Sequence, residues 1–210
     1  MLDNIGDNSK YLELVSADLL DADSIDKACE DCDLVVHVAS PFVMNDPKDE
    51  NDVLGPAING TENVINACFK NNVKRVVVTS SCISILDWNN LNEADETQWA
   101  PIDGSTPVYN KSKILAEKKA WEMVKNPPDG KKLELVTILP GFVVGRPLYK
   151  ASGASIDTVS GILTGKIPRL PCVYFPMVDV EDVSNWSLYS SFSTFLGGSG
   201  TLVGSNCPDR

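Results

Sequence analysis

Three short apolar runs alternate with helix-like segments along the chain, and this alternation constrains the fold more than any other feature of the sequence. The runs cover residues 34–38, 73–79 and 133–139 and are rich in Val, Ile and Leu. Runs of this kind are typical of strands that are buried on both faces of a parallel sheet. Parallel neighbours need crossover connections, so the sequence predicts an α/β protein with an open, doubly wound parallel sheet.

Two long segments between these runs have the 3.6-residue periodicity of core-facing helices. Residues 52–71 place their apolar side chains on one stripe, and residues 108–125 form the second predicted helix. The helix 108–125 must end at the Asn126-Pro127-Pro128-Asp129-Gly130 segment, since proline cannot continue it.

Shorter elements are predicted around these. Residues 11–17 alternate loosely between apolar and polar and predict a strand that runs into a turn at Asp18-Leu19. Ser24 is the expected N-cap of a short helix that extends to Cys32. A further short helix is expected over residues 155–166. The stretch 82–107 has no clear period and is expected to be a surface loop, whose Trp88 and Trp99 either line a pocket or hold the loop down.

Composition limits the classes of function. The 210 residues are 43% hydrophobic and 22% charged, which predicts one globular domain, complete or not. The formal net charge of -11 repels phosphate backbones and anionic membrane surfaces, so a nucleic-acid or membrane-surface partner is not expected. No apolar run is long enough to cross a bilayer. The N-terminus is acidic where a secretory signal needs a basic start, so the expected location is cytoplasmic.

The six cysteines and the single histidine are expected to be structural. Most of the cysteines fall inside predicted helices and strands, where a reduced thiol behaves as a small hydrophobe. Cys29 and Cys32 have Cys-x-x-Cys spacing, but no second pair accompanies them and their neighbours are acidic, so we predict neither a metal nor a redox site there. His37 lies within a predicted strand and is expected to be a packed ring without chemistry.

Tyr109 and Lys113 are the residues that point most clearly to chemistry. On a helix they lie at i and i+4, so that the phenol and the ammonium project from one face. A neighbouring positive charge favours the phenolate, which predicts a tyrosine pKa below its ordinary value near ~10. Ser81, at the end of a predicted strand, is placed to hydrogen-bond the same substrate oxygen. The alternatives are a solvated helix face for the pair and a turn-capping role for the serine.

Seven blocks in order resemble the extended short-chain dehydrogenase/reductase superfamily, whose other name is the NAD-dependent epimerase/dehydratase superfamily. The resemblance is to its branch of dihydroflavonol and cinnamoyl-CoA reductases, and it runs from about Tyr11 to Val183. The blocks are Leu14-Val15-Ser16-Ala17-Asp18-Leu19-Leu20-Asp21, His37-Val38-Ala39-Ser40-Pro41, Asn59-Gly60-Thr61, Val78-Thr79-Ser80-Ser81, Tyr109 with Lys113, Pro140-Gly141-Phe142-Val143-Val144-Gly145 and Val178-Asp179-Val180-Glu181-Asp182-Val183.

The resemblance implies a Rossmann-like fold and an NADP-dependent oxidoreductase, with NAD as the alternative cofactor. It implies that Ser81, Tyr109 and Lys113 are catalytic and that Asn59 supports the site. The residues it implies in cofactor binding are Asp18, Leu19, Val38, Ala39, Ser40, Tyr109, Lys113, Pro140, Gly141 and Val143. Asp18 is expected to meet the adenine amino group; its alternative is a loop aspartate that caps the following turn.

Two departures from the family pattern limit this prediction. The sequence has no Gly-x-x-Gly-x-x-Gly turn and none of the first strand and first helix that frame it, so the phosphate cradle is missing and cofactor affinity is expected to fall by orders of magnitude. Residues 184–210 form a Ser/Gly-rich tail that predicts no helix. We therefore expect residues 1–183 to be a partial dinucleotide-binding domain with a remnant of a substrate region, truncated at both ends.

Three functions are compatible with this sequence. The first is carbonyl reduction of a small molecule by hydride transfer. The second is the related chemistry of nucleotide-sugar epimerases and dehydratases or of 3β-hydroxysteroid dehydrogenases. The third is a catalytically silent truncated form that acts only by association with another protein. A homodimer formed through the two long helices, as is common in the superfamily, is a further expectation.

Overall fold

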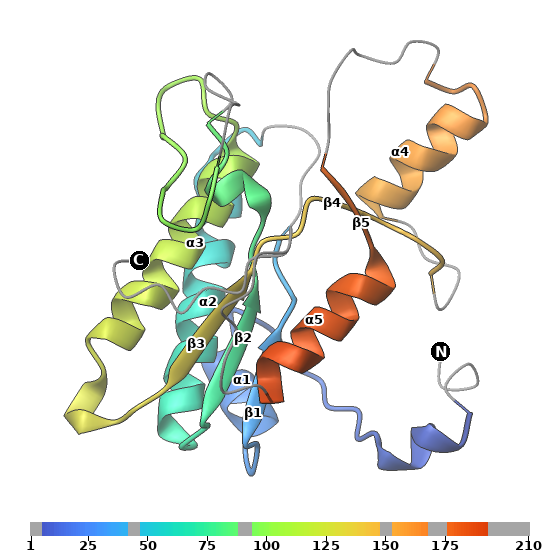
Figure 1. Cartoon of the computed structure of the whole chain (residues 1–210). Coiled ribbons are helices and arrows are strands. Elements are labelled where there is room, and N and C mark those ends of the chain that lie inside the picture. Colours follow the sequence, from blue (N-terminus) through green and yellow to red (C-terminus); the bar gives the residue numbers. More distant parts are fainter. Residues whose placement is uncertain (1–5, 42–46, 88–93, 148–152, 168–175, 193–210) are drawn as a thin grey trace.

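The computed structural model describes residues 6–41, 47–87, 94–147, 153–167 and 176–192. Its centre is a parallel sheet of the strands β1 (Leu34–His37), β2 (Arg75–Thr79) and β3 (Glu134–Ile138), in the order β1-β2-β3. The register pairs His37 with Val78 and Thr79 with Ile138, so all three carboxyl ends meet at one edge. The predicted parallel α/β architecture is therefore confirmed (Figure 1).

Three helices cover one face of this sheet. They are α1 (Ala22–Ala28), α2 (Asn51–Lys70) and α3 (Val108–Lys125), and the two long ones have nearly the predicted bounds. Their inner sides and the facing strand residues form the main core, which buries apolar surface worth about 25 cal/mol per Å². The buried members at its centre are Val64, Ile65, Cys68, Val73, Val76, Val78, Ala120, Trp121 and Leu135.

The other face of the sheet is covered by α5 (Val180–Phe192), and here the prediction of a helix-free tail was wrong over Ser184 to Phe192. The hydroxyl groups of Ser184, Ser187 and Ser191 each donate to the carbonyl four residues before, which satisfies them within the helix. Small side chains also let the helix pack closely, with Trp186 against Val77, Val136 and Ile138. Residues 193–210, the rest of the predicted tail, lie outside the described residues.

The predicted strand at 11–17 is also not formed. The chain begins with the 3-10 helix η2 (Gly6–Tyr11) and continues without regular structure, extending away from the sheet (Figure 1). Tyr11, Leu14 and Val15 are 79%, 72% and 59% exposed. A strand needs a neighbour to take its backbone hydrogen bonds, and in the described part of the chain no strand pairs with this segment.

The short helix α1 begins earlier than predicted. Asp21, not Ser24, is its N-cap, and its carboxylate accepts from the backbone amides of Asp23 and Ser24. The hydroxyl of Ser24 instead donates to the carbonyl of Asp21 at 2.8 Å. The helix ends at Ala28, with Cys29 as its C-cap.

The remaining elements connect the helices and form a second, small sheet. This parallel pair is β4 (Phe142–Val144) with β5 (Met177–Asp179), and α4 (Ala154–Leu163) lies between them in sequence, close to the predicted short helix. The 3-10 turns η3 (Cys82–Ser84) and η4 (Pro128–Gly130) follow β2 and α3. None of the described helices is both long and apolar enough to span a membrane.

The cysteines that the structure describes are thiols. Cys29 and Cys68 are buried in the main core, and Cys32 packs against it. Among the described residues, no three His, Cys, Asp or Glu side chains are grouped so that they could hold a metal ion.

Gly141 allows β4 and β5 to approach each other. A Cβ at position 141 would lie 2.0 Å from the carbonyl oxygen of Pro176, the acceptor of the 2.6 Å hydrogen bond from the Phe142 amide. We expect Gly141→Ala to lower the free energy of unfolding by about 1–3 kcal/mol, because backbone atoms must shift. Chemical denaturation measures this change.

Gly55→Ala is the matched control. Apart from its chain neighbours and the local helix backbone, nothing lies within 4 Å of a Cβ at position 55, which is inside α2. This substitution should change the free energy of unfolding by less than about 1 kcal/mol, since the helix propensity of alanine is opposed by the clash of its Cβ with the ring of Pro56. Equal effects of the two substitutions would contradict the close approach at Gly141.

Candidate active site

The carboxyl edge of the sheet brings together three of the predicted segments. Val38, Ala39 and Ser40 follow β1, Ser80 and Ser81 follow β2, and the segment 140–143 follows β3. The backbone ladder continues beyond the strands, with the Ser80 amide donating to Ile138 at 2.8 Å and the Cys82 amide to Pro140 at 3.0 Å. Open α/β sheets bind their ligands at this edge.

Ser81 begins the turn that leaves β2. It is the N-cap of η3, and its Oγ accepts from the amide of Ile83 at 3.3 Å. The turn-capping alternative is thus realised, but a hydroxyl that accepts one bond keeps its proton for another acceptor. Ser81 is buried, at 8% exposure.

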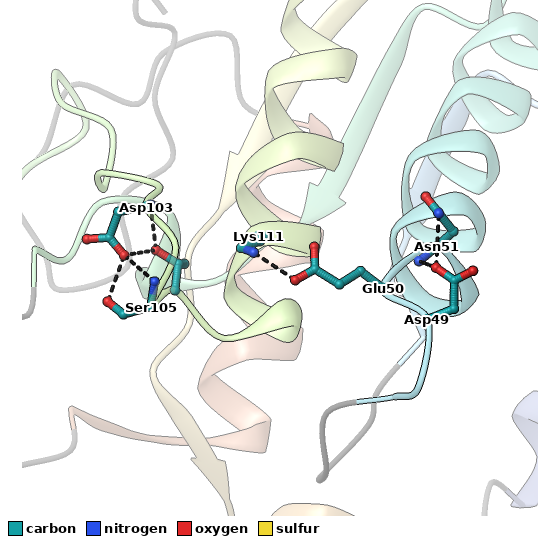
Figure 2. A network of polar contacts seen from close by, with 7 residues as sticks. Asp49, Glu50, Asn51, Asp103, Ser105 and Lys111 are labelled. Atoms are coloured by element: carbon teal, nitrogen blue, oxygen red, sulfur yellow. Dashed lines mark hydrogen bonds and ion pairs between the residues drawn. The ribbon is translucent and has the colours of Figure 1, made fainter.

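The start of α3 is fixed from two sides, as Figure 2 shows. Lys111 forms an ion pair of 2.8 Å with Glu50, at the N-terminus of α2. In the loop before the helix, the carboxylate of Asp103 accepts from the amide and the hydroxyl of Ser105 at 2.8 and 2.7 Å. The ion pair joins the first turns of α3, which carry Tyr109, to the start of α2, whereas the Asp103 contacts order the loop itself.

Lys113 is buried beside the end of β1. Burial lowers its pKa to about 8, and the charge on Glu117 acts in the opposite direction. Burial likewise lowers the pKa of His37 to about 4, and the charge on Lys113 adds to this effect. His37 is therefore a packed neutral ring, as predicted, and its interaction with Lys113 places the ammonium near the carboxyl edge.

The pKa of Tyr109 corrects the prediction. Burial raises it, and negative charge on Cys82 adds to the rise, so the expected lowering by Lys113 is not found. Desolvation of the buried ring disfavours the phenolate and is the larger of the two causes. A tyrosine of this kind is fully protonated at neutral pH and can donate its proton.

The sequence analysis missed a buried carboxylate on α3, that of Glu117, which contacts the residue before Ser81. Glu117, 1% exposed, accepts from Ser80 Oγ at 2.5 Å and from Trp121 Nε1 at 3.4 Å. The available signal was its position four residues after Lys113, on the helix face that also carries Ile114 and Trp121.

A cleft of about 360 Å³ opens beside the turn and the helix. The cleft is lined by η3 and the residues shortly after it, by the loop before α3 and by the first turns of α3. The lining residues are Ile83, Leu86, Asp87, Ala100, Pro101, Asp103, Ser105, Thr106, Pro107, Asn110 and Ile114. Trp99 does not line it; the indole packs against the main core, 5.1 Å from Lys118 Nζ. Trp88 lies outside the described residues.

Asp18 and Leu19 occupy a separate turn before α1. The carboxylate of Asp18 accepts from the Leu20 amide at 2.9 Å, which is the capping role given as its alternative. Leu19 packs against the main core, and its carbonyl accepts from Asn63 Nδ2 at 2.7 Å. The turn is thus anchored to α2. Asn59 is exposed on α2, and its exposure does not support the expected role of its side chain in the site.

The single histidine gives a direct measurement of the buried charge. We expect the imidazole signals of His37 to titrate with a midpoint near pH 4 in NMR spectra, because burial and Lys113 both disfavour imidazolium. Lys113→Met should raise this midpoint, since it removes the repelling charge. Lys111→Met, on the same helix but paired with Glu50, is the control and should leave it unchanged. A midpoint near 6.5 in the parent protein would contradict the burial of His37.

Comparison with known proteins identifies the family. Residues 2–147 match the 3-beta hydroxysteroid dehydrogenase/isomerase family. The chain is 38% identical to cinnamoyl-CoA reductase 1 of Arabidopsis thaliana over 179 residues, which cover 82% of this chain and 50% of the relative.

Two solved structures are similar in fold. Vestitone reductase from alfalfa has a TM-score of 0.76 with this chain. The two are 28% identical, over 96% of this chain and 65% of that one. The yeast methylglyoxal/isovaleraldehyde reductase in complex with NADPH has a TM-score of 0.73 and 29% identity, over 82% of this chain and 57% of that one.

The chain spans about half the length of the curated relatives it matches. The resemblance to the reductase branch of the superfamily is nevertheless confirmed by sequence and by fold. The family match covers most of the chain, including the turn after β2, α3 and all of β4. The protein belongs to the 3-beta hydroxysteroid dehydrogenase/isomerase family.

Proposed function

We propose that the protein is the catalytic part of an NADP-dependent reductase that converts a small carbonyl compound to an alcohol. The observation that carries the proposal is the meeting of the Ser81 turn with α3: Cys82, the neighbour of Ser81, interacts with Tyr109, while Lys113 interacts with His37 at the end of β1. A cleft of about 360 Å³ lies next to them in sequence, lined by Ile83 and Asn110 but not by Ser81, Tyr109 or Lys113, and offers room for a small substrate.

The proposed chemistry uses the three residues in distinct roles. Tyr109 donates its phenolic proton to the carbonyl oxygen as the alcohol forms. The phenol is protonated at rest, but its raised pKa makes it a weaker acid, so the transfer requires stabilisation of the tyrosinate. Ser81 donates a hydrogen bond to the same oxygen and orients the carbonyl. The charge of Lys113 stabilises the tyrosinate that remains, so the interaction matters after proton transfer more than before it.

The residues at the carboxyl edge fit the nicotinamide half of the cofactor. Val38, Ala39 and Ser40, after β1, and Pro140, Gly141 and Val143, after β3, leave small side chains and backbone at this edge. Lys113 would bond the nicotinamide ribose, and Asp18 and Leu19 would face the adenine. When bound, the reduced nicotinamide supplies the hydride for the carbonyl carbon.

The reductase names of the relatives favour reduction over the epimerase and dehydratase alternatives. We propose that residues 1–183 form the cofactor-binding unit and that the protein acts in the cytoplasm. A homodimer through α2 and α3 is not favoured, because the exposed large apolar side chains of the described residues lie elsewhere: on the N-terminal segment, β1, the loop before α3, α4, β5 and α5.

Tyr109→Phe should abolish most of the turnover. Without the phenolic proton we expect carbonyl reduction with NADPH to fall about 10²–10⁴-fold, while the unfolding temperature stays close to that of the parent. Tyr189→Phe, on an exposed part of α5, is the matched control and should retain full activity. Steady-state rates with a panel of aldehydes and ketones measure both. Parent turnover that survives Tyr109→Phe would remove this residue from the mechanism.

NADPH binding separates a weak enzyme from a silent form. Since the sequence has no Gly-rich phosphate turn, we expect a dissociation constant in the range of about 0.1 mM or weaker in calorimetric titrations. Lys113→Met should weaken binding further, whereas Lys111→Met should not. If the parent gives no saturable heat at millimolar NADPH, the silent alternative is favoured.

A further inference from the structure

Glu117 is a buried carboxylate for which the proposed chemistry has no use. It lies on the inner face of α3 at 1% exposure, with Ser80 Oγ at 2.5 Å from Oε2 and Trp121 Nε1 at 3.4 Å from Oε1. Burying a charged group is expensive unless hydrogen bonds and an opposite charge offset the cost. An apolar residue would fill the same space in the core without the free-energy cost of desolvating a charge, so the carboxylate requires an explanation.

One side of Glu117 is tied to the turn that carries Ser81. Ser80, the donor to its carboxylate, directly precedes Ser81 in the chain. The hydroxyl of Ser80 also lies 3.0 Å from that of Ser84, which is fully buried at the end of η3. Ser80 and Ser84 bracket Ser81, so one carboxylate on α3 fixes both ends of the turn against the helix.

The other side of Glu117 acts on Lys113. The two residues are at i and i+4 on α3, and both are buried. Burial lowers the pKa of Lys113, and the charge on Glu117 opposes this. The other titratable neighbours do not replace it: His37 on β1 is a neutral ring, Cys82 on η3 interacts with Tyr109, and Glu62 on α2 pairs with Lys119.

We propose, on the basis of the function proposed above, that Glu117 is a positioning residue that couples the two halves of the site. Through Ser80 it holds the turn of Ser81 against α3, and through its charge it keeps Lys113 protonated inside the protein. One buried carboxylate therefore sets both the position of Ser81, the proposed hydrogen-bond donor, and the charge of Lys113.

The first experiment tests the charge. Glu117→Gln keeps the shape of the side chain and an oxygen that can accept from Ser80, but it removes the negative charge. We expect the midpoint of the Lys113 side chain, followed by NMR at Cε and Nζ in uniformly labelled protein, to fall by about one unit or more from its parent value. Glu122→Gln, at an exposed position of the same helix, should leave it unchanged.

The second experiment tests the tether. Ser80→Ala removes the hydroxyl that joins Glu117 to the turn and changes no charge. We expect hydrogen exchange at the amides of Ile83 and Ser84, which bond Ser81, to accelerate at least about tenfold, as is typical when a bond of roughly 1.4 kcal/mol is lost. Ser160→Ala, at an exposed position of α4, is the control. Unchanged exchange rates in Ser80→Ala would overturn the proposed link between Glu117 and the turn. This experiment can be carried out even if Glu117→Gln does not fold.

These readouts separate this proposal from the reductase proposal. If the parent shows no carbonyl reduction, the reductase proposal fails, but the Lys113 midpoint and the exchange rates still report on Glu117. If the parent is active and depends on Tyr109 while Glu117→Gln leaves the Lys113 midpoint unchanged, only the Glu117 proposal fails. In an active parent, Glu117→Gln should also move the alkaline limb of the activity profile to lower pH.

Discussion

The candidate site depends on charge that is buried between α3 and the sheet. Desolvation lowers the pKa of Lys113 to about 8, which brings its titration close to the physiological range while most of it stays charged at pH 7. The same exclusion of water keeps His37 neutral and Tyr109 protonated. Electrostatic interactions are stronger in such a site than in water, which is why the charge on Lys113 acts on His37.

Much of the fold follows from periodicity in the sequence. The apolar runs became β1, β2 and β3, and the two long periodic segments became α2 and α3, because burial on both faces or on one stripe leaves a clear pattern. The failures were in segments whose structure is decided elsewhere in space. Residues 11–17 have the composition of a strand but no neighbour, and Ser184 to Phe192 form a helix whose serines are satisfied by carbonyl groups one turn earlier.

The chemistry of the site was predicted less completely than its residues. Spacing placed Tyr109 and Lys113 on one helix face, and strand order placed Ser81 at the sheet edge. The sign of the tyrosine shift depends on how deeply the phenol is buried, which no local pattern records, and burial is the main cause of the raised pKa. Glu117 was missed because an isolated glutamate on a helix is ordinarily solvated, and only the packing of Ser80 and Trp121 identifies it as a core residue.

Binding strength and chemical competence have different structural sources in this chain. The residues proposed for proton transfer are held by elements that pack within the main core, so their arrangement does not depend on a bound cofactor. Affinity for a dinucleotide, by contrast, comes largely from backbone amides at a Gly-rich turn, which this sequence does not contain. Uniform binding energy lowers the concentration of cofactor that is needed without changing the chemical step. Substitutions at the phosphate contacts and at the reacting groups are therefore expected to act on different quantities, the first on cofactor affinity and the second on the rate of the chemical step, because separate parts of the fold supply them.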